Sequence, residues 1–164
     1  MASKEGAIRL ATNADVPRLL EIERESATAA HWAELDYRNA FTSQSPRRLI
    51  LVAEPDQRVE GFLVARCAVA AEWEIENVVV AKDARREGLG AALVSFVLEQ
   101  IRTETSDPKQ PGMVHLEVRE SNLAARHLYE KFGFLLDSRR TAYYRHPDED
   151  AILYRFMFQQ HSRT

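Results

Sequence analysis

The sequence predicts an α/β protein in layers, with helices flanking a mixed central sheet, and three observations support this class. Strand-like stretches follow one another in the middle of the chain, between Arg48 and Val80. A long amphipathic helix begins at Gly88-Leu89-Gly90. A further strand and a further helix then follow each other before two last strand-like stretches. Helices, a meander of strands and strand–helix units in this order are typical of such a layered sheet.

The elements of the first half follow from periodicity and turn residues. Thr12 and Asp15 match a helix capping box, and the residues after them have helical spacing. Pro55-Asp56-Gln57 marks a turn between two strands of a hairpin. The expected order is a strand at 8–11, helices at 16–22 and about 33–41, and strands at 48–54, 58–68 and 72–80.

In the second half of the chain, the ends of the helices and strands are marked more clearly by the sequence. An apolar stripe defines the helix that begins near Gly88, and two prolines make Glu104 to Gly112 a loop. Ser121-Asn122 is a good N-cap for the next helix, and Gly133 stands where a left-handed helix stop belongs. Strands are expected at 113–118, 134–140 and 152–158.

Composition favours a soluble cytoplasmic protein with one domain, residues 1–164. Hydrophobic residues make up 45% and charged residues 29% of the 164 residues. Cys67 is the single cysteine, so no internal disulfide is expected and a reducing compartment fits. The net charge of −3 weighs against nucleic acid as the main partner, and no apolar run is long enough for a membrane span. The five histidines lack metal-ligand spacing, so no metal is expected.

The segment from Arg85 to Ala91 is the candidate phosphate-binding site. It follows a strand and begins a helix, where free N–H groups and a partial positive charge favour anions. Gly88 and Gly90 would let the backbone approach a pyrophosphate, while Arg85 and Arg86 add charge. A tight turn with two solvated arginines is the alternative. The segment matches neither a Walker loop nor a Rossmann fingerprint.

Two blocks of sequence resemble the GNAT superfamily of N-acetyltransferases. Arg85-x-x-Gly88-x-Gly90 is similar to its CoA-binding signature. The run from Leu116-Glu117-Val118-Arg119 through Ser121-Asn122 to Leu128-Tyr129-Glu130 and Gly133-Phe134 resembles the RimI-type ribosomal-protein alanine acetyltransferases, as do the surroundings of Trp32 and the tail 140–151. The resemblance implies the GNAT acyl-CoA N-acyltransferase fold, acetyl-CoA as donor, and transfer to the N-terminal amine of a peptide or protein.

The resemblance also implies roles for individual residues. Glu117 takes the place of the general base and Tyr129 that of the general acid. Tyr143 and Tyr144 correspond to residues beside the peptide groove. A bulged strand should pair with the pantetheine arm, one of its N–H groups polarising the thioester carbonyl. The expected cofactor-binding set is Val78, Val79, Val80, Arg85, Arg86, Gly88, Leu89, Gly90, Ala91, Asn122 and Tyr129.

Simpler interpretations stand beside these roles. Glu117 can be a solvated carboxylate at a strand end, and Tyr129 can be a core residue on the apolar side of its helix. Glu76, which alternates with Glu72 and Glu74 on one face of a strand, is a second candidate for the base. The chemistry itself is consistent, because an amine must lose its proton before it attacks, and a carboxylate can accept that proton.

Two departures from the RimI pattern fall on the acceptor side. One extra residue separates Arg140 from the tyrosine pair, and Ala-Ala-His precedes Trp32 where an aromatic residue and a proline are usual. They put a ribosomal-protein substrate in doubt and leave cofactor binding untouched. The alternatives to a protein N-terminus are a small amine (a polyamine, antibiotic or metabolite) and a noncatalytic acyl-CoA-binding module. The oligomeric state is left open.

Overall fold

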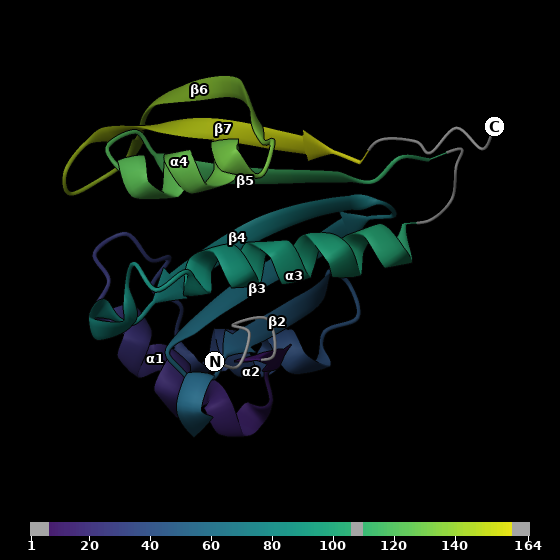
Figure 1. Ribbon diagram of the computed structural model, residues 1–164. Helices are drawn as coiled ribbons and strands as arrows, with labels where there is room; N and C mark the ends of the chain where they lie inside the picture. The colour runs from purple at the N-terminus through teal and green to yellow at the C-terminus, as the bar shows by residue number, and fades with distance from the viewer. Residues whose placement is uncertain (1–6, 106–109, 159–164) are drawn as a thin grey trace.

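A computed structural model describes residues 7–105 and 110–158, which fold around one seven-stranded sheet (Figure 1). The strands lie in the order β1-β2-β3-β4-β5-β7-β6. Their bounds are β1 Ile8–Leu10, β2 Arg47–Ala53, β3 Gly61–Val69, β4 Glu72–Val80, β5 Met113–Arg119, β6 Leu135–Tyr144 and β7 Glu149–Met157. The helices are α1 Val16–Arg24, α2 Glu34–Thr42, α3 Leu89–Glu104 and α4 Leu123–Lys131.

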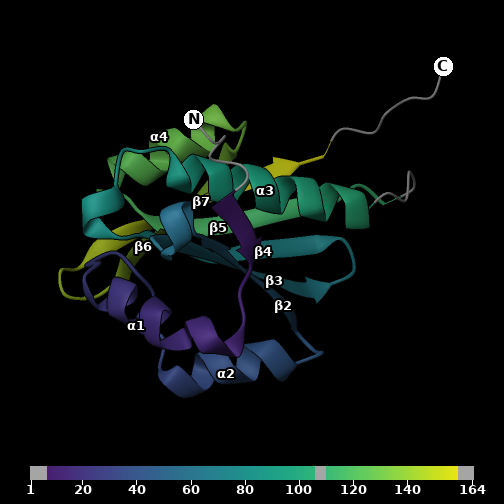
Figure 2. The same cartoon turned by 60° about the horizontal axis from the view of Figure 1, so that its bottom comes forward.

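Helices cover both faces of this sheet. Figure 2 shows α3 and α4 on one side and α1 and α2 on the other. Leu93, Val97 and Ile101 of α3 are fully buried, as the apolar stripe of that helix requires. On the opposite face Tyr37 of α2 packs edge-on against Phe62 of β3, with ring centroids 6.0 Å apart. The helices bury the central strands from both sides, as the sequence predicts for this class, whereas β6 at the edge of the sheet is exposed.

The sheet opens between β4 and β5, because these two strands pair over only part of their length. These strands are parallel, whereas the other neighbouring strands are antiparallel. Their register runs from Glu72 beside Met113 to Ile75 beside Leu116, although β4 continues to Val80 and β5 to Arg119. A bulge at Glu76 follows immediately, since Val64 of β3 faces Asn77 while Ala65 faces Ile75. The strands diverge from there toward the end at which α3 begins (Figure 1).

Most predicted elements are confirmed, and the differences have local causes. The return strand of the first hairpin begins at Gly61 instead of Arg58, because Asp56 and Gln57 adopt positive φ in a turn that delays the pairing. The capping box is present, but it begins a short 3₁₀ turn, Asn13–Asp15, before α1. The last two strands are longer than predicted. Within the predicted loop at 104–112, Glu104 still belongs to α3, and residues 106–109 lie outside the described part.

No helix in the described ranges has the length and apolarity needed to cross a membrane.

Candidate active site

The segment between β4 and α3 forms a turn with two left-handed residues, at the position where the sequence predicts a phosphate-binding site. Arg86 and Gly88 both have positive φ, at 65° and 83°, and Gly88 is the N-cap of α3. Left-handed residues alternating with extended or helical ones turn successive backbone N–H groups toward one point. The 16-residue helix α3 adds the free amides and partial positive charge of its N-terminus. Arg85 is fixed beside this turn, because its Nε donates to the Val80 carbonyl at 3.1 Å.

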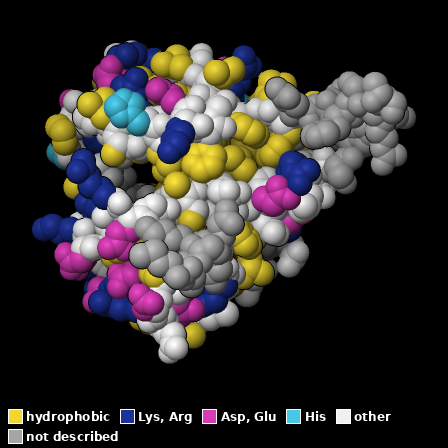
Figure 3. All heavy atoms as spheres, in the orientation of Figure 1, with side chains coloured by type: hydrophobic (Ala, Val, Ile, Leu, Met, Phe, Trp, Pro, Cys, Tyr) yellow, Lys and Arg dark blue, Asp and Glu magenta, His cyan; other side chains and the backbone are white. Residues whose placement is uncertain are grey.

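Gly90 lies in the first turn of α3, beside β4 and α4. A Cβ built at this position would lie 3.5 Å from Leu128 Cδ2 of α4 and 3.8 Å from Val80 Cγ2 of β4. Both are ordinary van der Waals contacts, so the packing of this chain does not itself demand glycine. Figure 3 shows hydrophobic side chains gathered across the middle of this face, where α3 and α4 adjoin.

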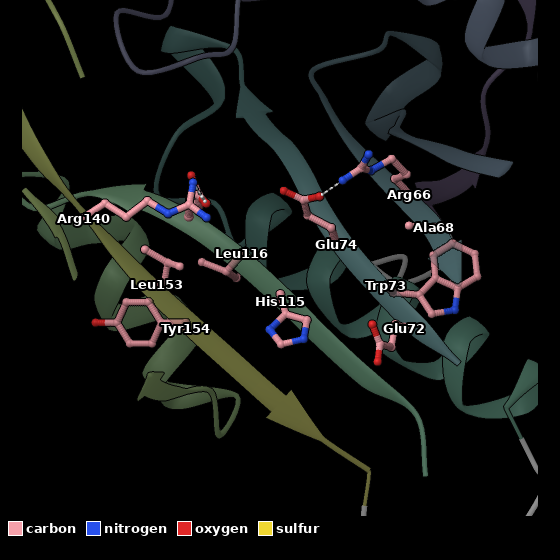
Figure 4. A pocket seen from close by; sticks show the side chains of 11 residues that line it. Arg66, Ala68, Glu72, Trp73, Glu74, His115, Leu116, Arg140, Leu153 and Tyr154 are labelled. Atoms are coloured by element: carbon pink, nitrogen blue, oxygen red, sulfur yellow. Dashed lines mark hydrogen bonds and ion pairs between the residues drawn. The ribbon is translucent and has the colours of Figure 1, made fainter. Parts of the chain in front are cut away.

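A cavity of about 280 Å³ lies against the sheet, with walls from β3 to β6. Figure 4 shows Arg140 on one side of it and the Arg66–Glu74 pair on the other, with His115 between them. Its lining residues are Arg66, Ala68, Glu72, Trp73, Glu74, His115, Leu116, Glu117, Arg140, Leu153 and Tyr154. The cavity therefore has both apolar and charged walls, and carboxylates and guanidinium groups supply its charge.

Glu117 lies in the wall of this cavity. It follows Leu116, the last residue of β5 in register with β4, so it stands where the two strands begin to part. Its side chain is 22% exposed, and Oε1 pairs with Arg140 Nη1 at 3.0 Å. Burial, and after it the Glu117 carboxylate, raise the pKa of Tyr144 to about 12. Glu117 thus sits half-buried between an arginine and a tyrosine, with solvent access for proton exchange.

Glu76, the second candidate for the base, has a different environment. Arg48 donates to both of its carboxylate oxygens, at 2.8 and 3.2 Å, and Arg66 lies 3.5 Å from Oε1. Only 15% of its side chain is exposed, and it is not among the residues that line the cavity. Two guanidinium groups therefore occupy Glu76, and this geometry favours Glu117 as the proton acceptor.

Tyr129 is the buried residue of α4. It is 6% exposed and packs against Phe134 and Tyr154, with ring centroids 5.6 and 6.5 Å away. Burial, and to a smaller extent the nearby Tyr144, raise the pKa of Tyr129 above its ordinary value. The hydroxyl therefore remains protonated at neutral pH and has a proton to donate in a hydrogen bond. Tyr129 has the packing of a core residue, and its neighbour Tyr154 lines the cavity.

The remaining predicted residues lie on two elements, Asn122 at the start of α4 and Tyr143 and Tyr144 at the end of β6. Asn122 is the N-cap of α4, and its Oδ1 accepts from the Ala125 N–H at 3.2 Å, so one end of its side chain has a structural role. Tyr143 and Tyr144 end β6 and pack edge-on at 5.2 Å. Tyr143 is 48% exposed, whereas the guanidinium of Arg119 lies 4.3 Å from the Tyr144 ring.

Comparison with known proteins gives these features a context. Residues 16–134 match the Acetyltransferase (GNAT) family. The chain is 33% identical over 150 residues to the ribosomal protein bS18-alanine N-acetyltransferase of Salmonella typhimurium, covering 89% of this chain and 93% of that protein. It is also 31% identical to an uncharacterized N-acetyltransferase of Methanocaldococcus jannaschii, covering 89% and 88%. The crystal structure of the Escherichia coli ribosomal-protein-S18-alanine N-acetyltransferase superimposes with a TM-score of 0.78 at 27% identity, covering 96% of each chain.

The chain belongs to the GNAT acetyltransferase family. This confirms the predicted fold and the predicted enzyme class, an N-acetyltransferase that uses acetyl-CoA. The roles of individual residues remain predictions.

The last hairpin of this GNAT domain contains a bulge in the segment where the sequence has the extra residue. Arg140 faces Ala151 and Tyr144 faces Glu149, so three residues of β6 oppose Asp150 alone. Ala142 adopts a φ of 49°, and its N–H donates to Asp150 Oδ1 at 2.8 Å. The bulge lies directly before Tyr144, so it sets the position of Tyr143 and Tyr144 relative to β7.

Sequence reasoning missed several cavity residues, above all Arg140, Arg66 and His115. His115 and Glu74 are register partners on β5 and β4, and Arg66 and Glu74 are partners on β3 and β4. The alternation of polar residues in each strand was visible, but the register that brings these strands together is not a local property.

Proposed function

We propose that this protein transfers the acetyl group of acetyl-CoA to the N-terminal α-amine of a protein in the cytoplasm. The observation that carries the proposal is Glu117, a half-buried carboxylate in the wall of the cavity, at the point where β4 and β5 part. The relatives named bS18-alanine N-acetyltransferases, matched over most of the chain, support an N-terminal amine as acceptor.

On the donor side, acetyl-CoA supplies the acetyl group as a thioester. The turn from Arg85 to Ala91 would hold its pyrophosphate through backbone N–H groups, with Arg85 and Arg86 supplying positive charge. Leu89 and Ala91, in the first turn of α3, contribute amides to the same site. The edge of Val78, Val79 and Val80 faces the opening beyond the last β4–β5 pair, so this backbone can hydrogen-bond the pantetheine arm. Asn122, at the start of α4, is proposed as a further cofactor contact through its amide nitrogen.

On the acceptor side, Glu117 would take the proton of the amine. An α-amine titrates near pH ~8, so at neutral pH most of it is protonated and cannot attack a thioester. The carboxylate reaches this proton directly or through one water molecule. Tyr143 and Tyr144 would border the peptide on one side and the segment around Trp32 on the other.

Tyr129 would help the leaving group by donating a hydrogen bond to the developing thiolate. Tyr129→Phe removes only the oxygen and keeps the contacts with Phe134 and Tyr154. We expect kcat to fall roughly ten- to a thousandfold, on the order of 1.4–4 kcal/mol, with thermal stability and CoA affinity little changed. Steady-state kinetics on the folded variant measure this. A kcat equal to that of the wild type would assign Tyr129 to packing alone.

The acceptor can be tested with peptides that differ only at the N-terminus. A peptide that begins with a free alanine and contains an internal lysine is expected to gain one acetyl group, at the α-amine. Blocking that N-terminus should stop transfer although the lysine remains, because the proposed acceptor is the α-amine, which loses its proton near pH ~8, whereas a lysine does so near ~10.4. Mass spectrometry after incubation with acetyl-CoA locates the group. Equal rates on the blocked peptide, or transfer to a polyamine alone, would contradict the proposal.

A further inference from the structure

Arg140 occupies a position on β6 from which it reaches Glu117 across β7. Its register partner on β7 is Ala151, which in turn pairs with Arg119 of β5. Paired residues of neighbouring strands share a face, and the methyl group of Ala151 leaves room above it for long side chains. Arg140 Nη1 therefore comes within 3.0 Å of Glu117 Oε1. The arginine belongs to the wall of the cavity in which the base lies (Figure 4).

The bulge in β6 holds this arginine in place. Asp150 fixes the bulge from both sides, because its carboxylate accepts from the Ala142 N–H at 2.8 Å and from Arg139 at 2.9 Å. The Arg140 guanidinium lies 5.2 Å from the centre of the Tyr143 ring, at cation–π distance. Tyr143 thus helps to hold the Arg140 guanidinium in position.

The other arginines near the cavity already form ion pairs with carboxylates of the protein. Arg66 pairs with Glu74 and Glu76, and Arg139 pairs with Glu120 and Asp150. Arg119 pairs with Glu149 and lies over Tyr144. Among the described residues, Arg140 has one carboxylate partner within 4 Å, Glu117, and 52% of its side chain is exposed. It is the guanidinium at this site with capacity left for a ligand.

The charge balance at Glu117 indicates what that ligand carries. An incoming ammonium group and Arg140 compete for one carboxylate, and two cations beside one anion repel each other. A second carboxylate, supplied by the acceptor, would pair with Arg140 and release Glu117 for the amine. Since consecutive Cα atoms are about 3.8 Å apart, an acidic side chain on the first or second residue lies within reach of both groups.

We propose that Arg140 is a specificity-determining residue that selects acceptors with a carboxylate close to the reactive amine. The carboxylate comes from an acidic residue at the start of a protein or from a free amino acid. The inference rests on the proposed function, which names the α-amine, and adds the class of acceptor to it.

The test uses three peptides that start with Ala-Glu, Ala-Gln or Ala-Lys and are otherwise identical, together with free glutamate. For the wild type we expect kcat/KM for Ala-Glu to exceed that for Ala-Gln by roughly three- to tenfold, with Ala-Lys lowest, because a half-exposed ion pair contributes modestly. Arg140→Gln should bring the three peptides to similar values, and Arg140→Glu should favour Ala-Lys. Each comparison is a ratio within one variant, so a general loss of activity does not affect it.

Arg145→Gln is the matched control. Arg145 is 71% exposed on the same hairpin, and its nearest carboxylate, Asp148, is 3.7 Å away. This variant loses the same charge and should keep the wild-type preference.

Equal wild-type rates on the three peptides would overturn the role of Arg140 and leave the proposed function intact, as would an Ala-Glu preference that survives in Arg140→Gln. Transfer to glutamate but to no peptide would retain Arg140 as the carboxylate-binding residue and refute the protein acceptor. Failure with every acceptor would refute both. The wild-type series decides the matter even where an Arg140 variant does not fold.

Discussion

Replacing Glu117 with glutamine is expected to lower kcat by roughly 10²–10⁴ at neutral pH, because the amide cannot accept the proton of the amine. Glutamine keeps the size of the side chain and an oxygen that can still accept from Arg140. The lost ion pair is half-exposed, with 52% of Arg140 accessible, so its removal should cost no more than about 1 kcal/mol of stability. Steady-state kinetics and a thermal melt of the same preparation separate the two effects.

The pH dependence of the Glu117→Gln variant gives a second readout. Below the amine's pKa of ~8, each unit of pH raises its neutral fraction about tenfold. The variant should therefore recover part of its rate as pH rises from about 7 to 9, while the wild type gains less.

Glu76→Gln serves as the control for this assignment. It breaks a bidentate pair with Arg48 that lies outside the cavity lining, so we expect at most a severalfold effect on kcat. If Glu117→Gln stays active and Glu76→Gln loses its activity, the role of base belongs to Glu76.

The sequence predicted the order and nature of the elements because each depends on local chemistry. Gly133 ends α4 with a φ of 95°, a conformation that favours glycine, and Asn122 caps the same helix as its position suggests. The alternation of β4 was correctly located from Glu72 to Val80. Signals of this kind come from residues a few positions apart in the chain, so they do not depend on which elements pack together in the fold.

The parts that could not be predicted depend on pairing between distant segments. The opening between β4 and β5 arises where a parallel register stops at Ile75 and Leu116, 41 residues apart in the chain. The bulge at Glu76 depends on β3, and the one that positions Arg140 depends on Asp150 of β7. The sequence alone could therefore not place Arg140 beside Glu117, because this contact depends on the register of the last hairpin.

Gly90→Glu is expected to weaken CoA binding at least about a thousandfold while the protein remains folded. The new side chain would start between Val80 of β4 and Leu128 of α4, where a Cβ meets only ordinary contacts at 3.8 and 3.5 Å. The carboxylate would then lie beside the turn that is proposed to hold the pyrophosphate. Like charges about 4 Å apart repel by about 4 kcal/mol at an effective dielectric constant near 20, which is roughly a factor of a thousand.

Two matched variants separate charge from bulk in this experiment. Gly90→Ala should keep its affinity for CoA and be at least as stable as the wild type, since alanine is favoured over glycine in a helix by up to about 1 kcal/mol. Gly90→Gln has the size of glutamate without its charge, so its affinity should fall between those of the alanine and glutamate variants. Calorimetric titration with CoA, after circular dichroism has shown that each variant is folded, gives the three dissociation constants. A folded Gly90→Glu protein that binds CoA as tightly as the wild type would remove the pyrophosphate from this turn, and the anion-binding geometry of Arg86 and Gly88 would then need another ligand.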